Sequence, residues 1–226
     1  FHDKMPQFYV RPGINVQEGG IGDYARVFAE DIKVYGLSVS TLVGETNVAA
    51  EMSVRQDMSL VATGNTVILP GNTTADGGDN SAFPRGDTFH FNASMITILN
   101  ENSLWDAATF IGEFAFNRRL NISANADQLD PLATKDASAI QFIFTPDYFQ
   151  VMPGLDMQVP IGFGFGIEGR SSVNGVLFPS EHGGNVSVGL KGDYNRMWRF
   201  SMTYNKYLGD AGSVIQYDAP VPTLSY

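Results

Sequence analysis

Bulky hydrophobic residues alternate with small or polar residues along most of this chain, with a period of two. Between positions 34 and 43, for example, Tyr35, Leu37 and Val39 alternate with glycine and serine. Successive side chains of an extended strand point to opposite faces, so this pattern predicts a strand with one apolar face. The pattern recurs and predicts strands near residues 34–43, 47–55, 89–99, 107–117, 138–145, 158–168, 185–194 and 198–207.

Short and long connections alternate between these strands. The two strands of a pair are joined by short turns, and Thr145, Pro146 and Asp147 form one of them. Longer loops rich in Gly, Asn, Asp and Ser cover residues 56–88, 117–136, 169–184 and 209–222. Helical periodicity is nearly missing. We therefore predict a single all-β region over residues 1–226, built from antiparallel hairpins.

Charged residues gather on one face of the predicted strands. The apolar faces carry none, whereas the opposite faces carry Glu51, Arg55, Glu113, Glu168, Lys191, Asp193 and Arg199. In the last hairpin, a turn that pairs Tyr194 with Trp198 places Asp193 opposite Arg199, which predicts a cross-strand ion pair. The sequence does not identify partners for the other charges.

Alternation alone does not say which face points inward, so a soluble sandwich or lipocalin-like barrel competes with a membrane barrel. The predicted strands are about nine to eleven residues long, the length that a tilted strand needs to cross a bilayer. Aromatic residues lie near strand ends, where the headgroup region favours them: Tyr35, Phe89, Phe116, Tyr194, Trp198 and Tyr204. These features predict an antiparallel up-and-down transmembrane β-barrel with a polar lumen.

Composition excludes several classes of protein. The net charge is −10, and a nucleic-acid-binding protein needs a basic surface instead. Cysteine is absent, so thiolate metal sites and disulfides are excluded. No apolar stretch is long enough for a transmembrane helix.

Four stretches resemble a large family of Gram-negative outer-membrane proteins that is catalogued as a domain of unknown function. The first two are F-A-E-D-I-K-V-Y-G-L-S-V-S-T at 28–41 and A-E-M-S-V-R-Q-D at 50–57. The others are F-H-D-K-M-P at 1–6 and F-I-G-E-F-A at 110–115. The resemblance is therefore patchy but extends over the whole chain.

This resemblance implies a porin-like barrel in the outer membrane, in contact with lipid and lipopolysaccharide. It also implies association with RND-type exporters and an envelope lipoprotein. The family has no catalytic motif that could be transferred to this chain. The chain is shorter than members of the family, so we expect it to be the C-terminal part of a larger barrel. The alternative is that about 8–10 strands close by themselves.

Enzymatic chemistry finds little support in the sequence. The three histidines, His2, His90 and His182, form no H-x-x-x-H pair, and no G-x-S-x-G motif is present. We therefore predict no catalytic residue, no metal site and no cofactor. The leading hypothesis is a channel for small molecules, hydrophobic ones among them. The alternative is a structural or surface-interaction barrel with a plugged lumen and partner-binding loops.

One glycine-rich stretch resembles a dinucleotide-binding fingerprint. Residues 161–169 read I-G-F-G-F-G-I-E-G, which contains G-x-G-x-x-G, but no helix pattern follows, as such a site requires. The glycines instead fall on the polar face of one strand. Gly162, Gly164 and Gly166 are thus expected to form a bare strip on the lumen wall, where the chain or the cargo approaches the backbone.

Overall fold

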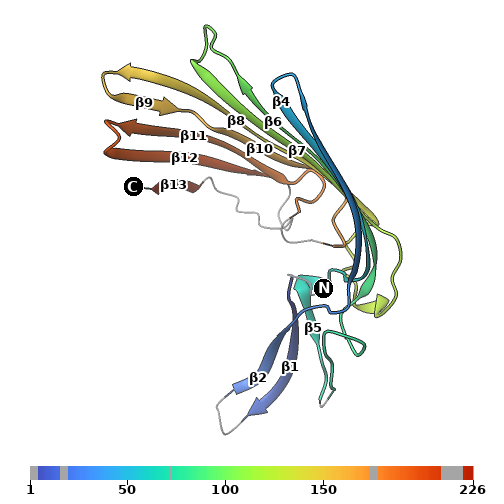
Figure 1. The fold of residues 1–226 in the computed structure, drawn as a ribbon. Helices are drawn as coiled ribbons and strands as arrows, with labels where there is room; N and C mark the ends of the chain where they lie inside the picture. The colour runs from blue at the N-terminus through green and yellow to red at the C-terminus, as the bar shows by residue number, and fades with distance from the viewer. Residues whose placement is uncertain (1–4, 16–19, 72, 174–177, 210–220, 226) are drawn as a thin grey trace.

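The computed structural model describes residues 5–15, 20–71, 73–173, 178–209 and 221–225. Most of them belong to one large antiparallel sheet that curves strongly (Figure 1). Its strands are β3 (Lys33–Val43), β4 (Thr46–Ser59), β6 (Arg85–Leu99), β7 (Ala107–Arg119), β8 (Asp136–Met152), β9 (Leu155–Gln158), β10 (Ile161–Glu168), β11 (Gly184–Tyr194), β12 (Trp198–Leu208) and β13 (Val221–Ser225). The predicted all-β, antiparallel class is confirmed.

The order of strands in this sheet nearly follows the order of the chain. Neighbours run β13-β12-β11-β10-β8-β7-β6-β4-β3, and the short β9 pairs with both β8 and β11. In the part of the chain that the structure describes, β3 and β13 are the two edges and do not pair with each other. The sheet is therefore an open trough here.

The hairpin between β8 and β10 differs from the prediction. The expected turn at Thr145, Pro146 and Asp147 lies inside β8, which continues to Met152 and turns back into β9. Pro146 is tolerated in the strand because the neighbouring strand is interrupted at its position, between β9 and β10. There the Pro146 carbonyl accepts a hydrogen bond from the Val159 amide at 3.1 Å.

The two faces of the sheet follow from the register. Bulky residues pair with bulky residues across neighbouring strands, as at Phe110, Phe144 and Ile161. Their rings pack together: the centroids of Phe110 and Phe142 are 5.7 Å apart, and those of Phe142 and Phe163 are 5.3 Å apart. We call this side the bulky face and the opposite side the polar face.

A second, smaller unit packs at one end of the sheet. It contains β1 (Gln7–Asn15), β2 (Gly20–Val27) and β5 (Thr66–Ile68), in the order β2-β1-β5. The 3-10 turns η1 (Thr63–Asn65) and η2 (Ala126–Gln128) lie in the loops that follow β4 and β7. The alternation predicts none of these three strands: β2 is mostly exposed, and β5, which lies inside loop 56–88, has only three residues.

The most buried core lies between this small sheet and the end of the large one. Its members are Tyr9, Ala29, Ile32, Met58, Ala62, Val67, Leu69, Phe83 and Val173. The Tyr9 hydroxyl donates to the Asp76 carbonyl at 2.7 Å and accepts from the Ala82 amide at 2.8 Å. Burial raises the pKa of the Tyr9 phenol above its ordinary value. Tyr9 therefore fastens β1 to the loop that precedes β6.

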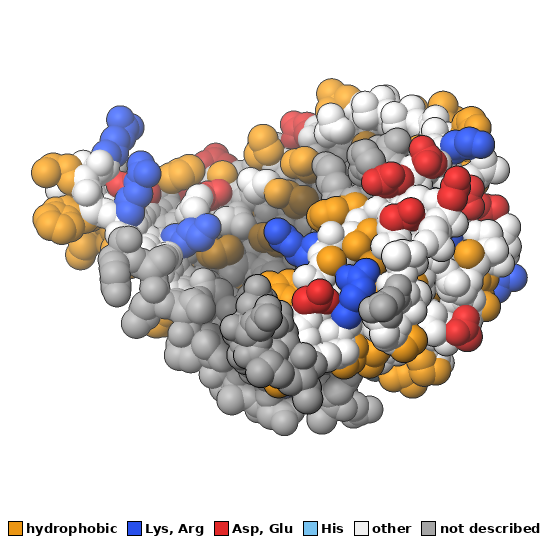
Figure 2. Space-filling model, turned by 90° about the horizontal axis from the view of Figure 1, so that it is seen from below, with side chains coloured by type: hydrophobic (Ala, Val, Ile, Leu, Met, Phe, Trp, Pro, Cys, Tyr) orange, Lys and Arg blue, Asp and Glu red, His pale blue; other side chains and the backbone are white. Residues whose placement is uncertain are grey.

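Arg85 holds the same junction from the start of β6. Its side chain is buried, and the guanidinium donates to the carbonyls of Glu30 at 2.6 Å, Asp57 at 2.8 Å and Gly78 at 2.8 Å. Longer bonds reach Gly77 at 3.3 Å and, from Nε, Asp57 again at 3.2 Å. One side chain thus ties the end of β4 to two separate loops. Asp and Glu side chains gather on the outside of this end (Figure 2).

None of the helices among the described residues is long and apolar enough to span a bilayer.

Candidate functional site on the polar face of the sheet

The polar face lies inside the curve of the sheet. The segment from Phe178 to Gly183 follows β10 and lies on this side (Figure 1). Gly166 binds it at two points: its amide donates to the Gly183 carbonyl at 2.8 Å, and its carbonyl accepts from the His182 amide at 2.9 Å. We call Phe178–Gly183 the inner segment. The polar side is therefore concave, and the bulky side is convex.

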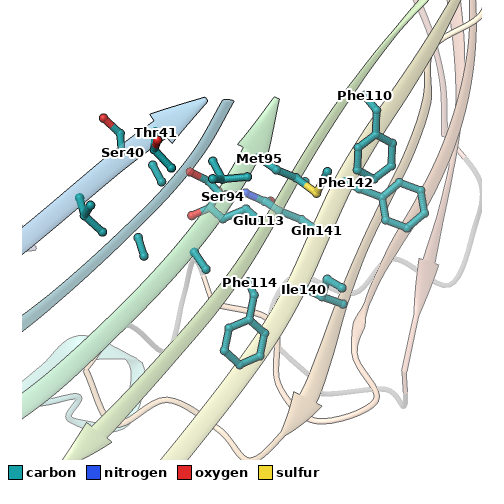
Figure 3. Close-up of a pocket in the computed structure, with 16 residues that line it drawn as sticks. Ser40, Thr41, Ser94, Met95, Phe110, Glu113, Phe114, Ile140, Gln141 and Phe142 are labelled. Atoms are coloured by element: carbon teal, nitrogen blue, oxygen red, sulfur yellow. Dashed lines mark hydrogen bonds between the residues drawn. The ribbon is translucent and has the colours of Figure 1, made fainter. Parts of the chain in front are cut away.

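Glu113 is the centre of a hydrogen-bonded group on the concave face. Register places it opposite Ser94 on β6 and Gln141 on β8. Its carboxylate accepts from the Gln141 side-chain amide at 2.7 Å and from the Asn92 side-chain amide. Figure 3 shows Ser94, Glu113 and Gln141 grouped together, apart from the rings of Phe110 and Phe142. Gln141 is not among the predicted site residues, although its alternation with Ile140 and Phe142 places it on the polar face.

The concave face near Glu113 is hollowed. A cavity of about 480 Å³ lies between Glu113 and Gln141 on the sheet, Phe178 on the inner segment and Tyr207 on β12. Its walls come from strands that are far apart in the sequence. The sheet thus combines a fixed carboxylate with a space large enough for a small molecule.

Glu51 and Arg55 lie on the concave face of β4 but do not meet. Glu51 stands opposite Asn92, whereas Arg55 stands opposite Thr88, four residues away along β6. The Thr88 hydroxyl lies 2.9 Å from Nε2 of His90. A cavity of about 700 Å³ is lined by Glu51, Arg55 and His90.

Three of the predicted charges lie together near the far end of the sheet. Asp193 and Arg199 stand in register, and Arg199 Nε donates to Asp193 Oδ2 at 2.9 Å, which confirms the predicted ion pair. This ion pair lines a cavity of about 490 Å³, and Lys191 lines it as well, together with Asp147 and Asp156. This group lies far along the strands from Glu113.

Glu168 lies elsewhere than expected. The register between β10 and β8 shifts after Gly166, so Glu168 stands opposite Ser138. Ser138 in turn stands opposite Phe116, which belongs to the bulky face. The strict alternation that assigns Glu168 to the lumen therefore fails at this bulge, because an extra residue reverses the side to which the chain points.

The glycine strip is covered by other parts of the chain. A Cβ on Gly166 would lie 2.0 Å from the Ser180 carbonyl oxygen, and one on Gly162 would lie 2.5 Å from Ser187 Oγ. A Cβ on Gly164 would lie 3.1 Å from Asn185 Oδ1. At Gly166, the group that approaches the bare backbone is therefore the inner segment.

The six aromatic residues expected to face lipid lie on the bulky face in the register. Tyr35 and Phe89 both stand opposite Val54, and Phe116 stands opposite Phe91. Tyr194 pairs with Trp198 at the far end, but Tyr204 stands opposite Val188 in the middle of its hairpin. An apolar cavity of about 510 Å³ on this face is lined by Met95, Phe110, Phe114 and Phe142, among others (Figure 3).

A band of isoleucine crosses the concave face beside Glu113. Ile96, Ile111 and Ile143 stand in one row across β6, β7 and β8, and Ile98 lies two residues beyond on β6. All four side chains are exposed. The concave face is therefore not uniformly polar. It carries an apolar band next to a hydrogen-bonded carboxylate.

One protein-family model matches almost the whole chain. The family model described as "Protein of unknown function (DUF1302)" matches residues 1–219. This chain belongs to the DUF1302 family. The match covers the small N-terminal sheet and every strand of the large sheet except β13. No curated protein and no solved structure matches the DUF1302 chain.

Proposed function

We propose that this DUF1302 chain forms an outer-membrane β-barrel wall that passes small molecules along its concave face. The observation that carries the proposal is the division of the sheet into two faces: Phe and Tyr rings on the convex side, and Glu113, Asn92 and Gln141 inside the curve. An apolar outer surface suits contact with lipid and lipopolysaccharide, and a polar inner surface suits water.

The isoleucine band supports a hydrophobic cargo. These half-exposed apolar side chains, inside a water-filled lumen, give an apolar solute a surface to contact. The Glu113 carboxylate beside them keeps the wall hydrated. Such a passage would suit the outer-membrane step of an RND-type export system with a lipoprotein partner.

Flux through the purified protein tests this proposal. The chain folded in detergent is inserted into planar bilayers, and conductance is measured with Glu113→Gln and with Glu101→Gln as the matched control. Glu101 is exposed in the loop after β6, so its loss removes the same charge outside the concave face. We expect an open conductance whose cation preference falls in Glu113→Gln and is unchanged in Glu101→Gln.

A second function is favoured by the inner segment. Because Phe178–Gly183 lies over the concave face and is hydrogen-bonded to Gly166, it would narrow or plug a lumen. A plugged barrel would then act through its loops, as a structural or partner-binding protein. A well-folded protein that passes neither ions nor solutes would favour this function over the passage.

Folding is checked independently of flux. A membrane barrel stays folded in cold SDS and changes its electrophoretic mobility on boiling. A native monomer that is soluble without detergent would contradict both membrane proposals.

A further inference from the structure

Arg55 lacks the oxygen acceptors that hold several other arginines of the chain. Arg85 donates to backbone carbonyls, whereas Arg118 and Arg199 each pair with a carboxylate. Within the described part of the chain, no carboxylate forms an ion pair with Arg55. Its Nε is buried without a hydrogen-bond acceptor, and its Nη1 reaches only the sulfur of Met58, at 4.0 Å.

A buried donor without an acceptor is costly, and one on a charged group is more so. Glu51 lies on the same strand and the same face, but it stands opposite Asn92, four residues further along β6 than the position opposite Arg55. The residues opposite Arg55 on β3 and β6 are Val34 and Thr88, which carry no charge. Arg55 therefore carries a positive charge with no ion-pair partner among the described residues, and its Nε is an unused donor.

Arg55 faces a cavity of about 700 Å³, a volume within the range of small-molecule sites. The lining is mixed in character. His90, Asn92 and Asn117 give polar groups on the sheet, whereas Val173 and Phe178 give apolar cover from the loop after β10. A ligand that fits this lining has one anionic end and an apolar body.

We propose that Arg55 binds the carboxylate of a small organic acid whose apolar body lies against Phe178 and Val173. A carboxylate matches the planar guanidinium, which can donate to both of its oxygens. A monoanion suits the site better than a dianion, because only one cation is unpaired and Glu51 lines the same cavity. The proposal rests on the proposed function, since the cavity opens on the same concave face.

The test measures binding and not flux, so the two proposals can fail separately. The probe is 4-fluorophenylacetate, and its uncharged counterpart is 4-fluorophenylacetamide. The full chain, folded in detergent micelles, is titrated into the probe, and the line width of the ¹⁹F resonance is measured at each step. Empty micelles give the baseline line width. The variants are Arg55→Gln and Arg55→Lys, with Arg26→Gln as the matched control. Arg26 is exposed on β2 and lies outside the cavity.

We expect the acid to bind the wild-type chain and Arg26→Gln equally. It should bind Arg55→Gln roughly tenfold more weakly, and Arg55→Lys should fall between them. The amide should bind the wild-type chain roughly tenfold more weakly than the acid. Equal affinity for acid and amide, unchanged affinity in Arg55→Gln, or no binding of the acid at millimolar concentration would overturn the proposal.

The folding of each variant is checked by its mobility shift in SDS. If Arg55→Gln does not fold, Phe178→Ser is tested in its place. Phe178 lies on a loop, and the substitution removes an apolar side chain that lines the cavity. Weaker binding of the acid by Phe178→Ser, together with the preference of the wild-type chain for acid over amide, supports the site. Unchanged binding by Phe178→Ser counts against it.

Discussion

Replacing Arg85 with Met should loosen the junction between the small sheet and the large one. The substitution keeps an apolar stem of similar length but removes donors to the carbonyls of Glu30, Asp57 and Gly78. Each such bond to a charged donor contributes about 1.5 to 3 kcal/mol, and part of the loss is offset because a buried charge is removed as well. We expect a net loss of about 3 kcal/mol, which corresponds to about a hundredfold in an opening equilibrium.

Hydrogen exchange followed by mass spectrometry measures this loss where it occurs. Amides of residues 57–88 should exchange about a hundredfold faster in Arg85→Met, because these loops are held by the missing guanidinium. Peptides from the middle of β7 should not change. Arg118→Met is the matched control, since Arg118 is half exposed and its ion pair with Asp136 lies outside this junction. Exchange in 57–88 that stays within about threefold of the wild-type rate would refute the role given to Arg85.

Three further predictions concern other parts of the fold. Tyr9→Phe should lower the free energy of unfolding by about 1 to 2 kcal/mol in a urea titration, because a donor and an acceptor are lost. Burial raises the pKa of Tyr9, so the stability that its hydroxyl contributes should persist below about pH 10. This stability should be lost as the pH rises through the pKa that Tyr9 has in the folded protein. A difference in unfolding free energy between wild type and Tyr9→Phe that does not shrink at high pH contradicts this prediction. Gly166→Val should displace the inner segment, because the new Cβ would lie 2.0 Å from a backbone oxygen. A glutamate-specific protease should then cleave after Glu181 faster than in wild type. Gly13→Val is the control, because a Cβ at Gly13 has no atom within 4 Å, and its cleavage should be unchanged. Arg199→Gln should change the heat-induced mobility midpoint little, because this ion pair is exposed and contributes less than about 1 kcal/mol; a large shift would show that the pair has a structural role.

The strands of the large sheet could be predicted because their pattern is set by burial on one face. Alternation around Tyr35 and Phe163 reports directly which side of the strand each residue occupies. The ion pair of Asp193 and Arg199 could also be predicted, because a tight turn fixes the register of the hairpin. Local rules are sufficient where neighbouring strands are also neighbours in the sequence.

The remaining features depend on contacts that alternation does not encode. The bulge after Gly166 reverses the side of Glu168, and no residue type marks it. The partners of Glu113 come from two different strands, and the carbonyls around Arg85 come from two loops and the end of β4. A carbonyl acceptor carries no sequence signature, so such a junction is visible only in three dimensions.

The order of strands in the large sheet has a consequence for how the protein assembles. Apart from the step around β9, each strand pairs with the next strand of the large sheet along the chain, so most pairings join segments that are close in sequence. Closing short segments costs less chain entropy than closing long ones, and sheets of this kind can grow by adding one hairpin at a time. The small sheet is different, because β1 pairs in parallel with β5 across the whole β3-β4 hairpin. We therefore expect the large sheet to form first and the N-terminal junction, with Tyr9 and Arg85, to lock last.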